Sequence, residues 1–378
     1  MKIAIKNPEI RLPSLNRHKE TGLVGLEIQA GSIAAAELRD DGDGAVAEAA
    51  VQPLPTAAVD DGEIVDPEAV SAALRELFDS HGLSKRVRLG IANQRVVVRT
   101  VRLPAIEDPD ELASAIRFSA QEQIAMPLDQ AVIDHRVVGG VPEGDGPPQI
   151  DVMVVAARRD MIAAALKPLR DAGLDPVGVD LSAFGMIRAL ADTGAAPEPD
   201  AGVDGAAFGD RERAQSAVLY CNVGDVTNLA VARGRSCLFT RVSPVGLEDL
   251  AAGLATDTGL SHEHARMWLD YTGLIRPLEE IEGDPATLAK ARSTLETGAD
   301  NLLGELRLSL DFYGAQEAAV PVERVVLSGP GSAIAGLSEW MEPTLGLPIA
   351  VGRPAALAAL DDPSAARLTL PYGLALEQ

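Results

Sequence analysis

Apolar and polar positions along the chain follow two periods, which predict strands and helices in mixed order. Short apolar runs predict strands, in the first half at 23–28, 33–39, 87–92 and 96–103. Apolar residues at helical spacing predict helices over 66–81 and 110–124, and Gly82 follows the first as a C-cap. This order is typical of an α/β protein.

The pattern also divides the chain. Residues 96–175 read strand, helix, strand, strand, helix, which predicts a small α+β module. Residues 192–216 are rich in Gly, Ala, Pro and Asp and have no periodic apolar face, so they are predicted to be a linker. After the linker the chain starts again with three short strands, and a long helix is predicted from about 286 to 313.

Two stretches resemble each other at an offset of 195: residues 26–34 (LEIQAGSIA) and 221–229 (CNVGDVTNL). Each reads as a strand ending in a carboxylate or amide, a tight turn, a hydroxyl and a returning strand. The matched polar positions are Glu27 with Asn222 and Ser32 with Thr227, and Gly224 lies in the second turn. Two such hairpins facing each other form a phosphate clamp, because backbone N–H groups of small turn residues can approach an anion. A carboxylate at the strand end would hold Mg²⁺.

A third element follows near the C-terminus. Residues 326–333 (VLSGPGSA) predict a strand, a glycine turn and the start of a helix. Gly329 and Gly331 would let a ribose or base lie against the backbone, and Ser332 can cap the helix. Two hairpins and this turn, in this order, favour a two-lobe actin-like fold, a duplicated RNase H-like architecture. No Gly-Lys-Ser/Thr occurs, so a P-loop is excluded.

Composition narrows the function classes. The net charge of −23 and an aromatic content of 3% argue against nucleic-acid binding, since phosphate backbones are repelled and stacking platforms are few. No apolar run approaches the 18 to 20 residues of a membrane span. Two cysteines, without a Cys-x-x-Cys pair, predict neither a disulfide framework nor a zinc site.

The chain resembles the PilM family of type IV pilus assembly proteins from about residue 23 to 376. The stretches that carry the resemblance are 24–28, 103–104, 111–118, 124–128, 152–158, 172–176, 179–180, 223–227 and 327–332. The resemblance implies an actin-like α/β fold with an inserted subdomain like the 1C subdomain of the division protein FtsA. The implied parts are a flexible tail (1–20), a first lobe (21–95 and 176–195), the 1C-type module (96–175), the linker (192–216), a second-lobe core (217–245 and 320–378) and a helical subdomain (246–319).

The same resemblance implies a site for ATP and Mg²⁺. Its residues would be Glu27, Ser32, Asn222, Gly224, Thr227, Gly329, Gly331 and Ser332. The chain departs from the family at Gln29 and Ala34, where a glycine-rich turn and a lysine are usual. It also has Asn222 in place of an aspartate and Pro330 in place of a glycine, which deletes an N–H. These losses weaken contacts to phosphate and metal, so no catalytic or metal-ligand residue is assigned, and we expect a scaffold with little or no turnover.

The resemblance further implies the partners. A cytoplasmic N-terminal segment of the membrane protein PilN would bind in a groove between the first lobe and the module, near Arg117, Gln121 and residues 124–128. Pilus motor ATPases and the platform protein are further implied partners, and the implied location is the cytoplasmic face of the inner membrane. Two alternatives stay open: an active actin-like ATPase, and a membrane-associated filament protein of the FtsA type. The FtsA family ends in an amphipathic helix, whereas residues 368–378 are short and uncharged until Glu377.

Overall fold

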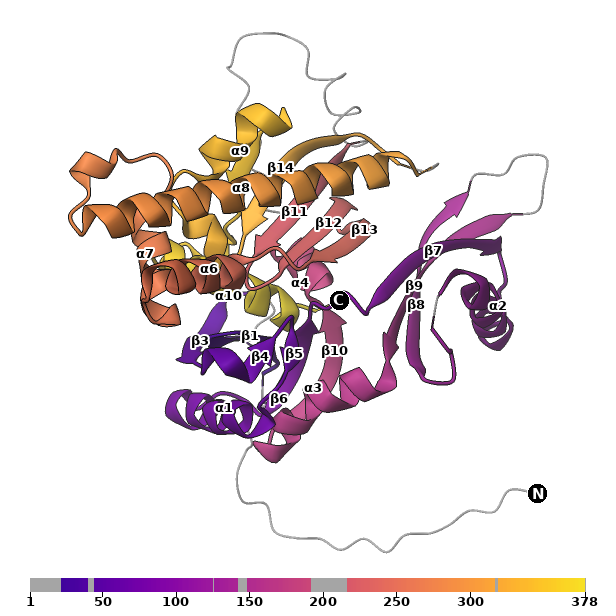
Figure 1. The fold of residues 1–378 in the computed structure, drawn as a ribbon. Helices are drawn as coiled ribbons and strands as arrows, with labels where there is room; N and C mark the ends of the chain where they lie inside the picture. Colours follow the sequence, from indigo (N-terminus) through magenta and orange to yellow (C-terminus); the bar gives the residue numbers. More distant parts are fainter. Residues whose placement is uncertain are drawn as a thin grey trace, which may run out of the picture.

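The computed structural model describes residues 22–39, 44–124, 126–141, 148–191, 216–316 and 319–377. The expected tail (1–20) lies outside the described residues, and so does the expected linker (192–216) apart from its last residue. The described part forms two lobes, each built on a five-stranded sheet, with a three-stranded module at the side of the first lobe (Figure 1).

The two large sheets have the same topology. The first has the order β3-β2-β1-β6-β10 and the second β13-β12-β11-β14-β15. The strands of the first are β1 (Val24–Gln29), β2 (Ser32–Leu38), β3 (Val46–Pro53), β6 (Arg86–Ile91) and β10 (Asp175–Leu181). Those of the second are β11 (Ala217–Val223), β12 (Thr227–Arg233), β13 (Ser236–Ser243), β14 (Val322–Ser328) and β15 (Ile349–Val351). In each, the opening strand pairs antiparallel with the second strand and parallel with the fourth. The duplicated two-lobe α/β fold expected from the sequence is therefore confirmed.

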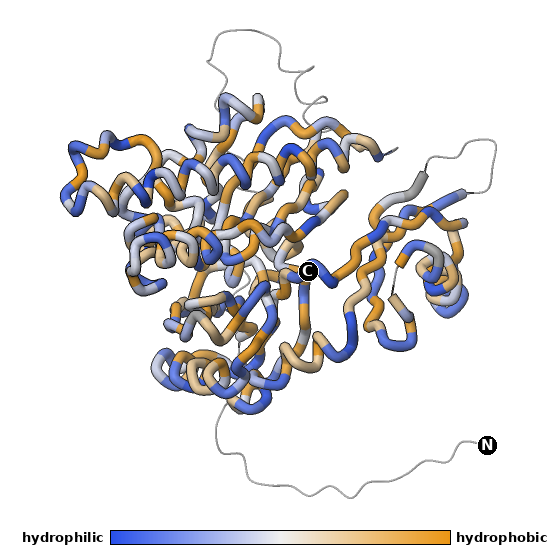
Figure 2. Tube along the Cα trace, viewed as in Figure 1, coloured by the Kyte–Doolittle hydropathy of each residue, from blue (hydrophilic) through white to orange (hydrophobic). Residues whose placement is uncertain are grey.

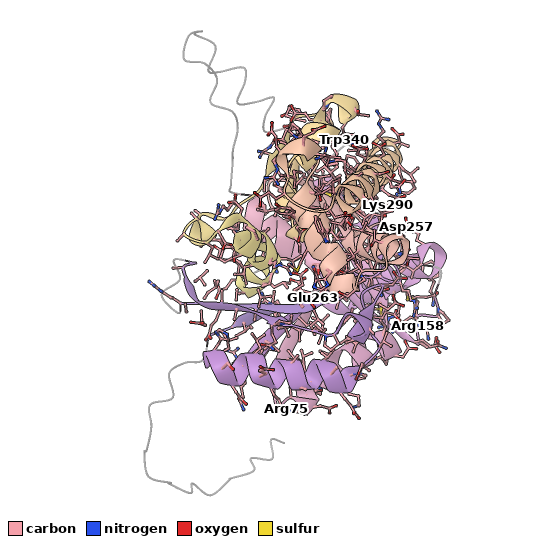
Figure 3. The ribbon with its side chains drawn as sticks, turned by 60° about the vertical axis from the view of Figure 1, so that its left-hand side comes forward. Arg75, Arg158, Asp257, Glu263, Lys290 and Trp340 are labelled. Atoms are coloured by element: carbon pink, nitrogen blue, oxygen red, sulfur yellow. The ribbon has the colours of Figure 1, made fainter. Side chains whose placement is uncertain are left out.

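Helices α1 (Pro67–His81) and α3 (Arg159–Asp171) cover one face of the first sheet. Helix α1 begins where the Asp66 carboxylate accepts the amides of Glu68 and Ala69, and it ends at Gly82, whose φ of 63° suits the left-handed C-cap. The Arg75 guanidinium on α1, labelled in Figure 3, donates to the carbonyl of Asp171 at the end of α3 at 2.7 Å. The pair of helices thus closes the first-lobe core.

The second lobe carries the helices on its outer side. They are α6 (Leu247–Thr258), α7 (His262–Thr272), α8 (Pro285–Gly314) and α9 (Leu337–Leu345). The long helix predicted from about 286 to 313 is confirmed by α8, whose buried leucines repeat at helical spacing. Figure 2 shows hydrophobic colouring along the central strands, while hydrophilic and hydrophobic positions alternate along the helices. Among the described residues, no helix has both the length and the apolar composition that crossing a bilayer requires.

The side module consists of three strands and one helix. These are β7 (Val97–Pro104), β8 (Ala131–Val141), β9 (Gln149–Arg158) and α2 (Pro109–Gln123), with the strand order β7-β9-β8. Buried residues of the helix and sheet form a core of their own, including Val101, Ile116 and Val154. The remaining short elements are η1 (Thr56–Ala58), β4 (Val59–Asp60), β5 (Glu63–Ile64), η2 (Leu278–Glu280), η3 (Pro330–Ala333) and η4 (Ala355–Leu357).

Helices α4 (Ser182–Leu190) and α10 (Asp362–Ala375) lie between the sheets. Helix α10 packs on α4, β1 and β2, all in the first lobe. The assignment of all of 320–378 to the second lobe is therefore wrong for α10. The physical reason is a close approach of backbones: a Cβ on Gly25 of β1 would lie 1.9 Å from the Pro371 carbonyl oxygen.

Two arginines fix the end of α10. Arg88 donates through Nη1 to the carbonyls of Leu374 and Leu376, at 2.8 and 2.7 Å. Arg188 donates through Nε to the Gly373 carbonyl at 2.9 Å and through Nη2 to the buried Asp180 carboxylate at 2.6 Å. These bonds satisfy carbonyls that a helix C-terminus leaves without intrahelical partners, and they place positive charge at its negative end.

Candidate functional site

The two matched hairpin turns touch each other. The Ala30 amide in the β1–β2 turn donates to the carboxylate of Asp225 in the β11–β12 turn, at the equivalent position 195 residues later. One residue earlier in each turn, a Cβ on Gly224 would lie only 2.8 Å from Nε2 of Gln29. Glycine at position 224 therefore lets the turns meet, and the contact joins the two lobes.

Glu27, predicted as a metal-side carboxylate, lies at the end of β1 with 9% of its surface exposed. Its Oε1 accepts a 2.6 Å bond from Nε2 of Gln29. Burial raises the pKa of Glu27 to about 7, and the Gln29 bond and the positive charge of Arg367 offset only part of that rise. The matched Asn222 is neutral, and its Nδ2 donates to the Ser328 hydroxyl at 3.4 Å.

The third predicted element lies beside the second hairpin. Gly329 has a φ of 78°, and a Cβ there would lie 2.8 Å from Oδ1 of Asn222. A Cβ on Gly331 would lie 2.4 Å from a methyl carbon of Val223. The Ser332 hydroxyl donates to the Gly329 carbonyl at 2.7 Å within the same turn. The structure thus brings this turn and the β11–β12 hairpin together, as close-packed backbone.

Two predicted hydroxyls have partners inside the protein. Thr227 is fully buried, and its Oγ1 donates to the Val245 carbonyl at 2.6 Å, so it lies away from the interlobe cavity. Ser32 accepts a 3.3 Å bond from Nη1 of Arg367 on α10. No sequence pattern pointed to Arg367, because α10 reaches the first hairpin only through tertiary packing.

A cavity of about 340 Å³ opens between the lobes, next to the hairpins. Its walls come from the ends of β1 and β6, from β5, from the start of α3 and from the β11–β12 hairpin. Of the predicted residues, Glu27 and Asn222 line it. Sequence reasoning missed Asn228, which also lines it and whose Oδ1 is buried without a hydrogen-bond partner. Such an oxygen costs free energy unless a ligand or water satisfies it, so Asn228 is a candidate ligand contact.

A group of charged side chains from α6 and α7 lies near Asp225 of the second hairpin. Arg266 on α7 pairs with Glu248 on α6, and His262 lies 3.1 Å from the same carboxylate. Burial, followed by the nearby Glu248 charge, raises the pKa of Asp225 well above its ordinary value, although Arg266 and the Ala30 amide oppose the rise. Burial also lowers the pKa of Arg367. The matched turn positions, 30 and 225, were the only sequence signal for this contact.

These residues do not fit ATP with Mg²⁺. Mg²⁺ is usually held by one or two carboxylates together with water and phosphate oxygens. Burial raises the pKa of Glu27 to about 7, which disfavours its ionised form, and the matched Asn222 is a neutral amide bonded to Ser328. Over the described ranges, no group of three or more His, Cys, Asp or Glu side chains is arranged to hold a metal ion. The turn N–H that would meet a phosphate, on Ala30, already donates to Asp225.

Comparisons with known proteins identify the family. Residues 25–376 match the family described as type IV pilus assembly protein PilM. The chain is similar to a structure of a PilM-PilN type IV pilus biogenesis complex, with a TM-score of 0.74, 24% identity, and coverage of 94% of this chain and 98% of that chain.

Two further structures share the fold at lower similarity. EutJ of Carboxydothermus hydrogenoformans, an ethanolamine utilization protein, has a TM-score of 0.50 and 14% identity, covering 93% of this chain and 88% of that chain. MreB5 of Spiroplasma citri, bound to ADP, has a TM-score of 0.51 and 10% identity, covering 94% and 95%. These likenesses confirm the actin-like fold. Because the family match spans nearly the whole chain, the chain belongs to the PilM family of type IV pilus assembly proteins.

Proposed function

We propose that this chain is a scaffold of the type IV pilus inner-membrane platform, and that it holds the cytoplasmic N-terminal segment of PilN. Family membership and the likeness to a PilM-PilN complex support the choice of partner. The observation that carries the proposal is the cavity of about 340 Å³ with the unpartnered Asn228 oxygen in its wall. An amide N–H of an extended segment is the natural donor for that oxygen.

The lining suits a peptide with an apolar side chain. Apolar side chains that line the cavity include Ile64, Ile91, Met161, Ala165 and Leu370. Polar groups also contribute, among them the Arg95–Glu63 ion pair at 2.9 Å and Asp160. Apolar walls with a few placed polar groups are typical of sites that bury one side chain and fix the orientation of its backbone.

The expected groove near α2 does not coincide with this cavity. Arg117 and Gln121 are exposed on α2 and do not line it, and Ile124 is buried in the core of the module. The reason is that α2 covers the module's own sheet and thereby buries one side of the predicted stripe. We therefore place the PilN segment at the interlobe cavity.

Filling the cavity mouth tests this placement. Ala164 on α3 is exposed and lines the cavity, so Ala164→Phe is expected to leave the fold intact and to obstruct the segment. We expect the affinity for a fluorescein-labelled peptide of the PilN cytoplasmic N-terminus to fall at least tenfold, about 1.4 kcal/mol, as measured by fluorescence anisotropy.

The neighbouring Ala163 provides a matched control, because it is exposed on the same helix and does not line the cavity. Ala163→Phe should bind the peptide like the wild type. Equal affinity of the Ala164→Phe variant and the wild type would refute the placement. Weak binding by all three proteins would refute PilN as the partner.

The remaining expected contacts follow from this scaffold role. Through PilN the chain would sit at the cytoplasmic face of the inner membrane, within reach of the platform protein and the motor ATPases. ATP and Mg²⁺ are not part of the proposal, because the hairpin residues do not fit them. Calorimetry with Mg-ATP tests that expectation directly.

A further inference from the structure

Only a small void lies on the side of the first hairpin that faces Arg367. The void between the first hairpin and the Gly329–Ser332 turn measures about 10 Å³. It is lined by Glu27, Gln29, Ser32, Ala34, Pro330 and Arg367. A volume of about 10–15 Å³ holds a single water molecule, so a phosphate group cannot enter without a rearrangement.

The backbone N–H of Ala30, in the first turn, already donates to a carboxylate of the chain itself. The Asp225 carboxylate accepts the Ala30 N–H, which is the kind of backbone donor that phosphate uses in glycine-containing turns. The bond crosses between the lobes, because Ala30 lies in the first lobe and Asp225 in the second. A carboxylate here makes the contact that a phosphate oxygen would otherwise make.

A cationic group lies on the same side. Arg367 projects from α10 to the Ser32 hydroxyl, at 3.3 Å. The charges that act on it include Asp225 from the second hairpin and Asp270 from α7, both of which favour its protonated form. Arg367 therefore supplies positive charge beside the first hairpin, and the charges of second-lobe carboxylates act on it.

We propose that Asp225, bonded to the Ala30 N–H and with the positive charge of Arg367 nearby, acts as an internal latch that takes the place of a bound nucleotide and holds the two hairpins together without a ligand. The latch makes the closed cleft the resting state of this chain. The inference goes beyond the proposed function, since it concerns the contact between the two hairpins and not the binding of PilN, although Asp225 also lines the interlobe cavity.

Nucleotide titration of the full chain tests the latch. We expect calorimetry with Mg-ATP, and separately with inorganic phosphate, to show no saturable binding by the wild type at millimolar concentrations. Asp225→Ala removes the acceptor of the Ala30 N–H and leaves Arg367 in place. We therefore expect this variant to bind Mg-ATP, inorganic phosphate or both at least tenfold more tightly. Tight Mg-ATP binding by the wild type that weakens in Asp225→Ala would overturn the proposal.

Hydrogen exchange provides a readout that needs no ligand. In the wild type, we expect slow exchange in peptides that cover residues 26–34, and at least tenfold faster exchange in Asp225→Ala. Asp225→Asn keeps an oxygen that can accept the bond, so its exchange should be intermediate. If Asp225→Ala fails to fold, the Asn variant alone carries the comparison. Equal protection in the wild type and the Asn variant, with no gain in binding, would contradict the latch.

Asp257 offers a control of equal charge. It lies on α6 and pairs with Lys290 of α8 at 2.7 Å, and both side chains are about half exposed (Figure 3). Asp257→Ala changes the net charge by the same amount as Asp225→Ala and lies away from the hairpins. It should therefore alter neither nucleotide binding nor exchange in residues 26–34.

Discussion

Gly373→Ala is expected to destabilise the protein by about 3 kcal/mol or more, because the new methyl group would meet backbone rather than a movable side chain. A Cβ at position 373 would lie 1.9 Å from the carbonyl oxygen of Gly185 on α4. Relieving this clash requires α10 to move away from α4. That movement would also disturb the contact of α10 with β1 at Gly25. Thermal unfolding followed by circular dichroism should show an apparent melting temperature lower by roughly 5 °C or more.

Gly304→Ala is the matched control for this prediction. Gly304 lies within α8, and nothing lies within 4 Å of the position its Cβ would take. Alanine is the better helix former, so this variant should be more stable than the wild type by roughly 0.5–1 kcal/mol. If Gly373→Ala melted at the wild-type temperature, the close crossing of α10 over α4 would be refuted.

Glu27→Gln is expected to stabilise the protein at alkaline pH, by about 3 kcal/mol at pH 8.5. Burial raises the pKa of Glu27 from 4.5 to about 7. Ionising this carboxyl therefore costs free energy in the folded protein that it does not cost in the unfolded chain. Between these two values the folded state binds more protons than the unfolded state. The free energy of unfolding of the wild type therefore falls as the pH rises through this window.

Glutamine has nearly the shape of a protonated glutamate and does not titrate. The gap in unfolding free energy between Glu27→Gln and the wild type should thus widen by about 2 kcal/mol from pH 5.5 to pH 8.5, measured by urea denaturation. The raised pKa of Asp225 adds a pH dependence of the same sign in both proteins, and Glu27→Gln removes part of it because the Glu27 charge is one of its causes. Glu76→Gln, on the exposed side of α1, controls for the change in net charge. Parallel stability curves for the wild type and Glu27→Gln would contradict the raised pKa.

Much of the local structure could be predicted from the sequence. The bounds of α1 follow from Asp66 and Gly82, and the long apolar stripe predicted α8 to within a residue at each end. The matched hairpins predicted the duplicated lobes. Such features depend on caps, periodicity and turns, which involve residues close together in the chain.

The sites were less predictable. Thr227 looked like a phosphate-binding hydroxyl, but its partner is the carbonyl of Val245, in the segment between β13 and α6. Asn228 looked like an ordinary strand residue, and only the fold shows that its oxygen is left without a partner beside a cavity. A hydroxyl or amide can bond to many groups, and the choice depends on which elements pack around it.

The elements, the repeat and the family resemblance could all be recognised in the amino-acid sequence, since these depend on local pattern. The folded arrangement was needed to see that α10 packs on the first lobe, that Arg367 reaches Ser32 and that Asp225 meets Ala30 across the lobes. The raised pKa of Glu27 belongs to the same class, because its main cause is burial. Desolvation and contacts between distant segments arise only when the lobes pack, and no periodicity in one stretch of chain encodes them.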